Sequence, residues 1–408
     1  MMRTMQGIFD GLRVLDFTQV LAGPTATRLM VEMGAEVIKV EMTPAGDFGR
    51  GLPQVRDGRS GYHVQQNRGK RSICVDLKDP RGQQLVLDLV PHVDVMIQNF
   101  ANGVIERLGF GYDVVSAINP RLIVCNMSAF GQTGPLKDHP GYDPIAQAYA
   151  GVLHVLGYED RPPVLAGISP GDVLTGVHSF GGVAAALYHR ERTGLGQEVR
   201  VALLDAYVTT HEVNWQSWSV SGGVEPIRRG NVHPVVGGCG VFAVGDGTYA
   251  VLAAVNDQQW RSTCEVMGRP ELATDARFET SAGRCENRDA INLEITEWFA
   301  GQPDRDAAIA QLEAKRVPTA PVLSLAEAAT HPHLIESGAL RWVDDDVLGQ
   351  VLVPGMPIKF SESPDNLPLQ AQQLGQDNEY VACEVGGRSA AEYQTLVEAG
   401  VLLHDQAT

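Results

Sequence analysis

Apolar and polar positions follow two different periods near the start of the chain. Residues 12–41 read LRVLDFTQVLAGPTATRLMVEMGAEVIKVE, in which two short β-rich runs, RVLDFT and EVIKVE, enclose a segment with helical spacing. Pro24 falls near the first turn of that helix and Gly34 follows its last turn, positions that favour these residue types. The pattern predicts a βαβ unit, and parallel strands joined through a helix indicate an open, Rossmann-like α/β sheet.

The same rhythm continues as far as residue 203. Helical spacing is found over 80–93, and a long apolar helix is predicted over 173–190. Glycines inside that second helix, such as Gly176 and Gly182, cost helix stability, so we expect another element to pack very close to it. Further strands are predicted over residues 72–77, 94–100, 121–131 and 198–203.

Glycine and proline accumulate after about residue 210. Residues 219–240, SVSGGVEPIRRGNVHPVVGGCG, predict a linker or mobile loop, and the apolar alternation on both sides of GDG predicts a β-hairpin over 241–254. Helical segments then follow up to about residue 315. We therefore expect a large α/β domain over 1–210, a linker over 211–225, a smaller α+β domain over 226–316, and a second linker with a C-terminal segment over 317–408.

Composition narrows the class of protein. A chain of 408 residues with 44% hydrophobic and 20% charged residues is typical of a globular protein with two domains. The net charge of −17 argues against a nucleic-acid partner, because phosphate neutralisation needs a basic face. No run of about 18 apolar residues predicts a membrane-spanning helix, and the first residues lead into a strand pattern without a signal-peptide core.

Cysteine and histidine positions argue against metal binding. The histidines of HPH (331–333) and HE (211–212) have no partner cluster. The cysteines show no CxxC spacing, which favours reduced thiols in a cytoplasmic protein and no structural zinc. The six are Cys74, Cys125, Cys239, Cys264, Cys285 and Cys383.

The βαβ start raises the question of a dinucleotide, and Glu41 lies where an acidic ribose ligand would be expected. The turn reads VLAGPTATR rather than GxGxxG, however, so the glycines needed for close pyrophosphate approach are missing. Neither a GxSxG nucleophile elbow nor a GxxxxGK phosphate-binding loop is present. A nicotinamide enzyme, a serine hydrolase and a nucleotide-hydrolysing fold are therefore not indicated.

A single aspartate, Asp172, stands among small residues in GISPGDVLTG (167–176), directly before the long apolar helix. The simplest interpretation is a helix cap, because Asp readily accepts hydrogen bonds from the free N–H groups of a first helical turn. A carboxylate that is partly desolvated can also serve as a nucleophile. The residues alone leave both interpretations open.

A resemblance covers residues 6–361 and favours the second interpretation. The chain resembles the class III coenzyme A transferases, the family of formyl-CoA and carnitine CoA-transferases and of 2-methylacyl-CoA racemases. Transferases of this family use the aspartate of the GD motif, here Asp172, to attack a thioester and form an aspartyl-CoA intermediate. The motifs that carry the resemblance are, in order, LRVLDFTQVLAGP, MGAEVIKVE, NRGKRSICVDLKDPRG, VMIQNF, RLGFGYDVVSAINPRLI, AFGQTGP, GYDPIAQAYAG, GDVLTG, RTGLGQEVRVALLDA, RRGNVHP, TAPVLSLAEA and MPIKFS.

The resemblance also implies contacts with coenzyme A, which is then a substrate rather than a permanently bound cofactor. Lys78 and Arg107 suit its phosphates, and Arg71, with Lys70, adds local positive charge. Each basic residue also has an alternative as an ordinary solvated side chain, and Phe100 either stacks on a purine or belongs to the core. The matching positions are Gln19, Arg71, Val75, Lys78, Asn99, Phe100, Arg107 and Leu108.

Departures from the formyl-CoA transferase pattern concern the acyl group. Where those enzymes have HVQAGP, this chain has QVLAGP, so Gln19 replaces a histidine and Leu21 replaces a glutamine near the reacting acyl group. Met42 replaces an arginine. HPVV (233–236) stands where a four-glycine loop is expected, and GGCG (237–240) follows it. These changes favour a larger or more apolar acid than formate or oxalate.

Two alternatives remain beside a transferase. A racemase needs a second acid/base and has a histidine before the aspartate of GxD, but this position is Tyr142, whose ordinary pKa near 10 makes it a poor base. Tyr142 is instead expected to line the acyl pocket or to pack. A non-catalytic acyl-CoA binding protein has no need of Asp172. The resemblance further implies two interlocked rings, that is, a homodimer.

Overall fold

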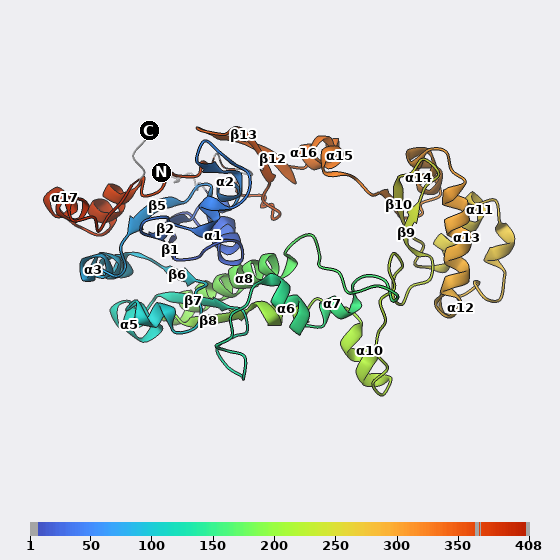
Figure 1. Cartoon of the computed structure of the whole chain (residues 1–408), viewed down its shortest axis with the longest axis horizontal. Helices are drawn as coiled ribbons and strands as arrows, with labels where there is room; N and C mark the ends of the chain where they lie inside the picture. The colour runs from blue at the N-terminus through green and yellow to red at the C-terminus, as the bar shows by residue number, and fades with distance from the viewer. Residues whose placement is uncertain (1–6, 364–366, 368, 405–408) are drawn as a thin grey trace. The chain divides into compact units, whose positions relative to one another are not determined.

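The chain folds into two compact units. The computed structural model describes residues 7–363, 367 and 369–404 (Figure 1). The large unit comprises residues 1–150, 167–212 and 331–408, and the small unit comprises residues 151–166 and 213–330. Residues 151–166 belong to the small unit, although the segments before and after them belong to the large unit. The domain boundaries predicted from the sequence placed all of residues 1–210 in the large domain and so did not include this crossing.

A six-stranded parallel sheet organises the large unit. Its strand order is β5-β2-β1-β6-β7-β8, so the chain moves outward from β1 to β5 and then returns to place β6 on the other side of β1. The predicted open α/β sheet is confirmed. The strands are β1 (Arg13–Asp16), β2 (Glu36–Met42), β5 (Arg71–Val75), β6 (Val95–Gln98), β7 (Ile123–Ser128) and β8 (Glu198–Ala202).

Helices cover both faces of this sheet (Figure 1). Successive strand residues point to opposite faces, so Leu15 contributes to one core and Val14 to the other. The first core is closed by α3 (Pro80–Leu89), α4 (Val104–Arg107), α5 (Tyr112–Ile118), the π-helix over Tyr380–Val385 and α17 (Ala390–Glu398). The second is closed by α1 (Ala22–Glu32) and α8 (Pro170–Thr193).

The close packing expected from the glycines of α8 is found at Gly176 against α1 and at Gly182 against β8. A Cβ at Gly176 would lie 2.5 Å from the carbonyl oxygen of Ala22, and a Cβ at Gly182 would lie 2.9 Å from Val199 Cγ1. Gly181, in contrast, faces open space. Two of the glycines are therefore required by neighbouring elements, and this fixes the start of α8 beside the start of α1.

Short elements complete the large unit. Two β-hairpins are formed by β3 with β4 and by β12 with β13. The remaining elements are β3 (Val55–Arg56), β4 (Arg59–Ser60), β12 (Leu340–Asp345), β13 (Gly349–Pro354), α2 (Gly61–Asn67), α6 (Asp143–Tyr149), α9 (Leu203–Val208), α16 (Pro332–Glu336) and the 3-10 turns Phe48–Gly51 and Val90–His92.

The small unit combines an antiparallel sheet with helices around a core that includes Trp260 and Phe299. The hairpin predicted over 241–254 is formed by β9 (Cys239–Ala243) and β10 (Tyr249–Ala253), and β11 (Thr319–Pro321) pairs with β10. The helices are α7 (Val152–Val155), α10 (Asn214–Val220), α11 (Asp257–Val266), α12 (Ser281–Glu286), α13 (Arg288–Ala300), α14 (Arg305–Ala314), α15 (Leu325–Thr330) and the 3-10 turn Pro270–Ala273.

Two predicted irregular segments contain regular structure. The segment 211–225, predicted to be a linker, holds the two-turn helix α10. The glycines of GGCG (237–240) lead into β9 and have local packing roles, since a Cβ at Gly237 would lie 2.2 Å from the carbonyl oxygen of Arg284. Gly238 has a φ of +80°, which favours glycine.

Within the described ranges, no helix is both long and apolar enough to cross a membrane. The same part of the chain contains no group of three or more His, Cys, Asp or Glu side chains that could hold a metal ion.

Candidate active site

A cavity of about 740 Å³ lies at the carboxyl ends of the parallel strands in the large unit. The strand order reverses between β1 and β6, and in open α/β sheets such a switch point leaves a crevice at this edge. Six residues singled out from the sequence line the cavity together. They are Gln19 and Leu21 after β1, Asn99 and Phe100 after β6, Tyr142 before α6, and Asp172 in α8.

Asp172 occupies the first turn of α8 without capping it. The N-cap residue is Ser169, Pro170 begins the helix, and no side-chain hydrogen bond caps this terminus. The cap interpretation of Asp172 is therefore wrong, although the carboxylate still lies where the helix dipole favours negative charge. Its carboxylate is free to face the cavity that Asp172 lines.

Burial, and then the nearby negative charge of Asp143, raise the pKa of the Asp172 carboxyl to about 7. An ordinary aspartate side chain titrates about three pH units lower. At neutral pH, Asp172 therefore exists in comparable amounts as acid and carboxylate. A strongly perturbed acid in a cleft is typical of an active site.

Asp143, which sequence reasoning did not single out, lies directly behind Asp172. The residue is 3% exposed, and its Oδ2 accepts a hydrogen bond from the backbone N–H of Asp172 at 3.1 Å. Oδ1 accepts from the Tyr207 hydroxyl and from Gln147 Nε2, both at 2.6 Å. Three elements, α6, α8 and α9, are thereby joined through one buried carboxylate.

Tyr207 also explains the glycine of the GD motif. A Cβ at Gly171 would lie 2.0 Å from the Tyr207 ring, so only glycine fits where α8 begins against α9. Asp143 carries only a weak sequence signal, because an Asp-Pro pair before an apolar segment resembles an ordinary helix start. Its contact with Tyr207 spans 64 residues and cannot be inferred from local pattern.

Tyr62 is a second residue that the sequence did not reveal. Burial raises the pKa of its phenol, and the charges of Asp172 and Asp47 raise it further. The Tyr62 hydroxyl therefore stays protonated under the influence of both negative charges. It belongs to α2, which packs over the 3-10 turn that contains Phe48, another residue of the cavity wall.

The remaining predicted coenzyme A contacts do not line the cavity. Lys78 and Arg107 are exposed and follow the carboxyl ends of β5 and β6, the edge of the sheet at which the cavity lies. Val75 is fully buried in the core, and Leu108 packs against that core. Phe100 packs against the core, as one of its two interpretations expected, and it also lines the cavity; stacking on a purine stays a prediction.

Arg71 and Lys70 do not supply the positive field expected of them. Arg71 lies at the amino end of β5, the opposite edge of the sheet, where it pairs with Glu36 and Asp377 and stacks on Tyr380. Lys70 is buried and its Nζ lies 3.0 Å from Asp16 Oδ2. Residue type suggested phosphate binding, but neither the strand direction nor these partners were visible in the sequence.

The substrate-pocket predictions fall at the cavity wall. Tyr142 is 76% exposed at the start of α6, and Leu21 precedes α1 as its N-cap residue. Apolar side chains form much of the wall around them, from Phe48, Phe100, Met127 and Leu203.

Comparisons with known proteins identify the family. The profile of CoA-transferase family III matches residues 9–378. The chain is 38% identical over 386 residues to an acetyl-CoA:oxalate CoA-transferase of Acetobacter aceti (93% of this chain, 97% of that one). It is 39% identical over 367 residues to a succinyl-CoA:mesaconate CoA-transferase of Haloarcula hispanica (88% and 91%).

A solved structure shares both sequence and fold. A CaiB/BaiF family protein from Brucella suis is 33% identical, with a TM-score of 0.81 over 93% of this chain and 100% of that one. The family profile, the named relatives and the shared architecture agree with the resemblance drawn from the motifs. The chain is an acyl-CoA:carboxylate CoA-transferase and belongs to CoA-transferase family III.

Proposed function

We propose that Asp172 is the nucleophile through which this enzyme moves coenzyme A from an acyl-CoA to a free carboxylic acid. One observation carries the proposal. Among the described residues that line the cavity, Asp172 is the one carboxylate, and it is half-buried with a pKa near 7. Raised basicity makes the ionised form a better nucleophile than an ordinary aspartate, while partial burial limits competing water.

The chemistry takes four substitutions at carbonyl carbon. The Asp172 carboxylate attacks the thioester, the C–S bond breaks, and a mixed anhydride and the CoA thiolate form. The thiolate attacks the Asp172 carbonyl of the anhydride, which releases the donor acid and leaves an aspartyl-CoA thioester. The acceptor carboxylate then attacks this thioester, and the freed thiolate attacks the acceptor carbonyl, which restores the Asp172 carboxylate. No net proton is transferred, and kinetics of the ping-pong type are expected.

Negative charge that develops on the attacked carbonyl oxygens needs donors close to the cavity. The first turn of α1 begins at Ala22, which lines the cavity, and the first N–H groups of a helix have no partner within the helix. These groups supply both hydrogen bonds and the positive end of the helix dipole. Lys78 and Arg107, exposed at the same edge of the sheet, suit the phosphates of coenzyme A.

The acceptor acid is proposed to have an apolar body larger than formate or oxalate. Leu21, Phe48 and Met127 on the cavity wall support this proposal. Because relatives are named for oxalate and mesaconate, the acids offered in a test should include both dicarboxylates and apolar monocarboxylates.

We further propose a homodimer in the cytoplasm. Along α8, Val173, Val177 and Tyr188 are exposed and recur at helical spacing, which supports burial against a second copy. No disulfide joins any of the six cysteines, all of which lie within the described residues, and this supports a reducing compartment.

Intact mass after incubation with a panel of acyl-CoAs tests the proposal. We expect wild type to gain the mass of coenzyme A minus water, mapped to Asp172, and Asp172→Ala to show no adduct. Exchange of the α-proton with solvent deuterium on a 2-methylacyl-CoA, without an adduct, would instead support a racemase. Binding of acyl-CoA without either reaction would leave a non-catalytic binding protein.

A further inference from the structure

The turn between β1 and α1 holds one strained residue beside the active-site cavity. Val20 has a φ of +66°, in the left-handed region that a β-branched residue strongly disfavours. Val20, with its neighbours Gln19 and Leu21, lines the cavity that contains Asp172. Such a conformation persists only where surrounding groups over-determine it, and it occurs most often at functional sites.

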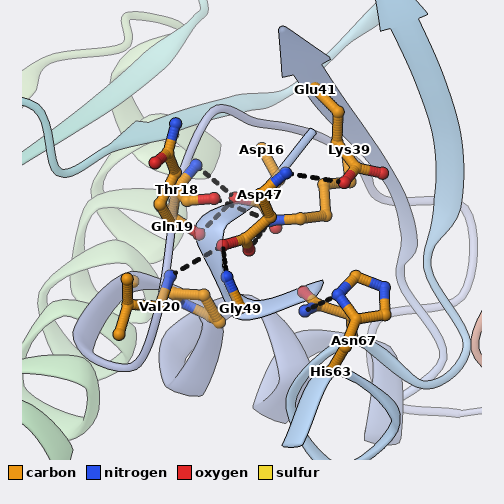
Figure 2. A network of polar contacts seen from close by, with 12 residues as sticks. Asp16, Thr18, Gln19, Val20, Lys39, Glu41, Asp47, Gly49, His63 and Asn67 are labelled. Carbon is orange, nitrogen blue, oxygen red and sulfur yellow. Dashed lines mark hydrogen bonds and ion pairs between the residues drawn. The ribbon is translucent and has the colours of Figure 1, made fainter. Parts of the chain in front are cut away.

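Side chains from the central strands hold the first part of this turn (Figure 2). Asp16 Oδ1, at the end of β1, accepts a hydrogen bond from the Thr18 N–H at 2.8 Å. Lys39 Nζ, from β2, donates to the Thr18 carbonyl oxygen at 2.6 Å. Both charged side chains are buried, so these bonds are shielded from water.

Asn99 holds the next residue from the other side. Its Oδ1 accepts from the Gln19 N–H and its Nδ2 donates to the Gln19 carbonyl oxygen, both at 2.8 Å. One side-chain amide from the end of β6 thus binds both backbone groups of Gln19. This differs from the role that the family resemblance implies for Asn99, a contact with coenzyme A.

Asp47 binds the strained residue, Val20, itself. Its Oδ1 accepts from the Val20 N–H at 3.1 Å and from the Gly49 N–H at 2.8 Å. Its Oδ2 lies 2.8 Å from Lys39 Nζ in a buried ion pair. The Asp47 backbone N–H donates to Glu41 Oε1 at 3.0 Å, so Asp47 is itself fixed to β2 (Figure 2).

Consecutive backbone groups from the Thr18 N–H to the Val20 N–H are therefore each bound by a side chain. We propose that Asn99 and Asp47 are positioning residues, which keep Val20 in the left-handed conformation and so fix the cavity wall against which the thioester meets Asp172. This inference rests on the proposed function of Asp172. Asn99 acts on catalysis through Gln19 rather than through affinity for coenzyme A.

Steady-state kinetics of Asn99→Ala separate these roles, with whichever acyl-CoA gives the Asp172 adduct in wild type. We expect kcat to fall about 100-fold and KM for the acyl-CoA to change less than about threefold, because the turn relaxes and the reacting groups lose alignment. A raised KM with an unchanged kcat would overturn the proposal and return Asn99 to coenzyme A binding.

A second substitution tests whether the strain at Val20 is what Asn99 sustains. Glycine adopts a φ of +66° without a Cβ clash. The double variant with Val20→Gly and Asn99→Ala should therefore have a kcat at least about fivefold higher than Asn99→Ala alone. This recovers part of the hundredfold loss. Failure of glycine to restore any activity contradicts the proposed link between Asn99 and the Val20 conformation.

Asp47→Asn tests the contact between Asp47 and the Val20 N–H. Asparagine keeps an oxygen for the Val20 N–H but removes the charge that faces Lys39, so we expect a smaller loss of kcat than with Asp47→Ala, again with little change in KM. Equal kinetics for wild type and Asp47→Ala would exclude Asp47 as a positioning residue.

Asn102→Ala is the matched control. Asn102 also binds two backbone carbonyls through its side-chain amide, those of Gly131 and Lys137, but it does not itself line the cavity and neither of these bonds reaches the turn. Its kcat should stay within twofold of wild type. If wild type itself forms no adduct, the proposed function fails; if wild type forms one and Asn99→Ala reacts equally fast, only the positioning proposal fails.

Discussion

Asp143 accepts a hydrogen bond from the backbone N–H of Asp172, so that two carboxylates lie one behind the other at the start of α8. Asp143 is fixed by Tyr207 and Gln147 and cannot turn away. Its charge adds to the effect of burial in raising the pKa of Asp172 to about 7. A second, buried carboxylate therefore contributes, after burial, to the raised pKa of Asp172.

Formation of the aspartyl adduct should depend on pH with a midpoint near 7. Because the pKa of Asp172 is raised, its nucleophilic carboxylate is the minor form below about pH 7 and the major form above it. The single-turnover rate of adduct formation should fall about tenfold per pH unit below that midpoint and level off above it. Rapid quenching followed by mass measurement between pH 5 and 8.5 gives the profile; a flat profile would contradict the assignment.

Asp143→Asn should move this profile toward acid. Asparagine keeps an oxygen that can accept from Asp172 or Tyr207 but removes the negative charge, so ionisation of Asp172 becomes easier. We expect the midpoint to shift downward by about one pH unit. Tyr207→Phe serves as the control that loosens Asp143 while keeping its charge, and its midpoint should stay closer to that of wild type.

Asp172→Asn should stabilise the protein, and more strongly at pH 8 than at pH 5. The folded pKa, about 7, lies above the ordinary value of 3.8, so the folded state binds the proton more tightly and loses stability as pH rises between these values. The variant lacks the carboxyl and so lacks this loss. Its free energy of unfolding should therefore exceed that of wild type by about 2 kcal/mol more at pH 8 than at pH 5. Urea unfolding at the two pH values measures the difference, and an equal gain at both would be inconsistent with the raised pKa.

Gly171→Ala should be severely destabilising. The new Cβ would lie 2.0 Å from the Tyr207 ring, so either α8 or α9 must shift, which disturbs Asp143 as well. We expect a loss of about 3 kcal/mol, at the upper end for overpacking. Gly181→Ala in the same helix is the matched control: its Cβ meets nothing within 4 Å, and alanine should stabilise the helix by up to about 1 kcal/mol. Thermal unfolding of both variants measures the difference. Equal melting temperatures for Gly171→Ala and Gly181→Ala would contradict the close contact with Tyr207.

Local periodicity was sufficient to predict the βαβ start, the parallel sheet and the hairpin of the small unit. Their strands and helices are set by neighbouring residues, and strand direction alone brings Gln19, Asn99 and Asp172 to one edge. Periodicity does not report partners distant in sequence. Asp143 with Tyr207, and Asn99 with Gln19, are contacts of that kind. Arg71 was assigned by residue type although its strand begins at the opposite edge of the sheet.

Leu21→Gln should shift the preference among acceptor acids. Leu21 lines the cavity beside Asp172, and glutamine has similar length but adds an amide that can bind a polar acyl group. We expect kcat/KM for oxalate, relative to that for an apolar acid such as isovalerate, to rise about tenfold, in keeping with one added or lost contact in a specificity pocket. Competition between the two acids for one acyl-CoA donor measures the ratio directly.

Leu21→Met keeps the wall apolar at nearly equal volume and should leave the ratio close to that of wild type. If methionine moved the ratio as far as glutamine does, the shape of the wall rather than its polarity would select the acid, and the proposal of an apolar acceptor based on Leu21 would be wrong.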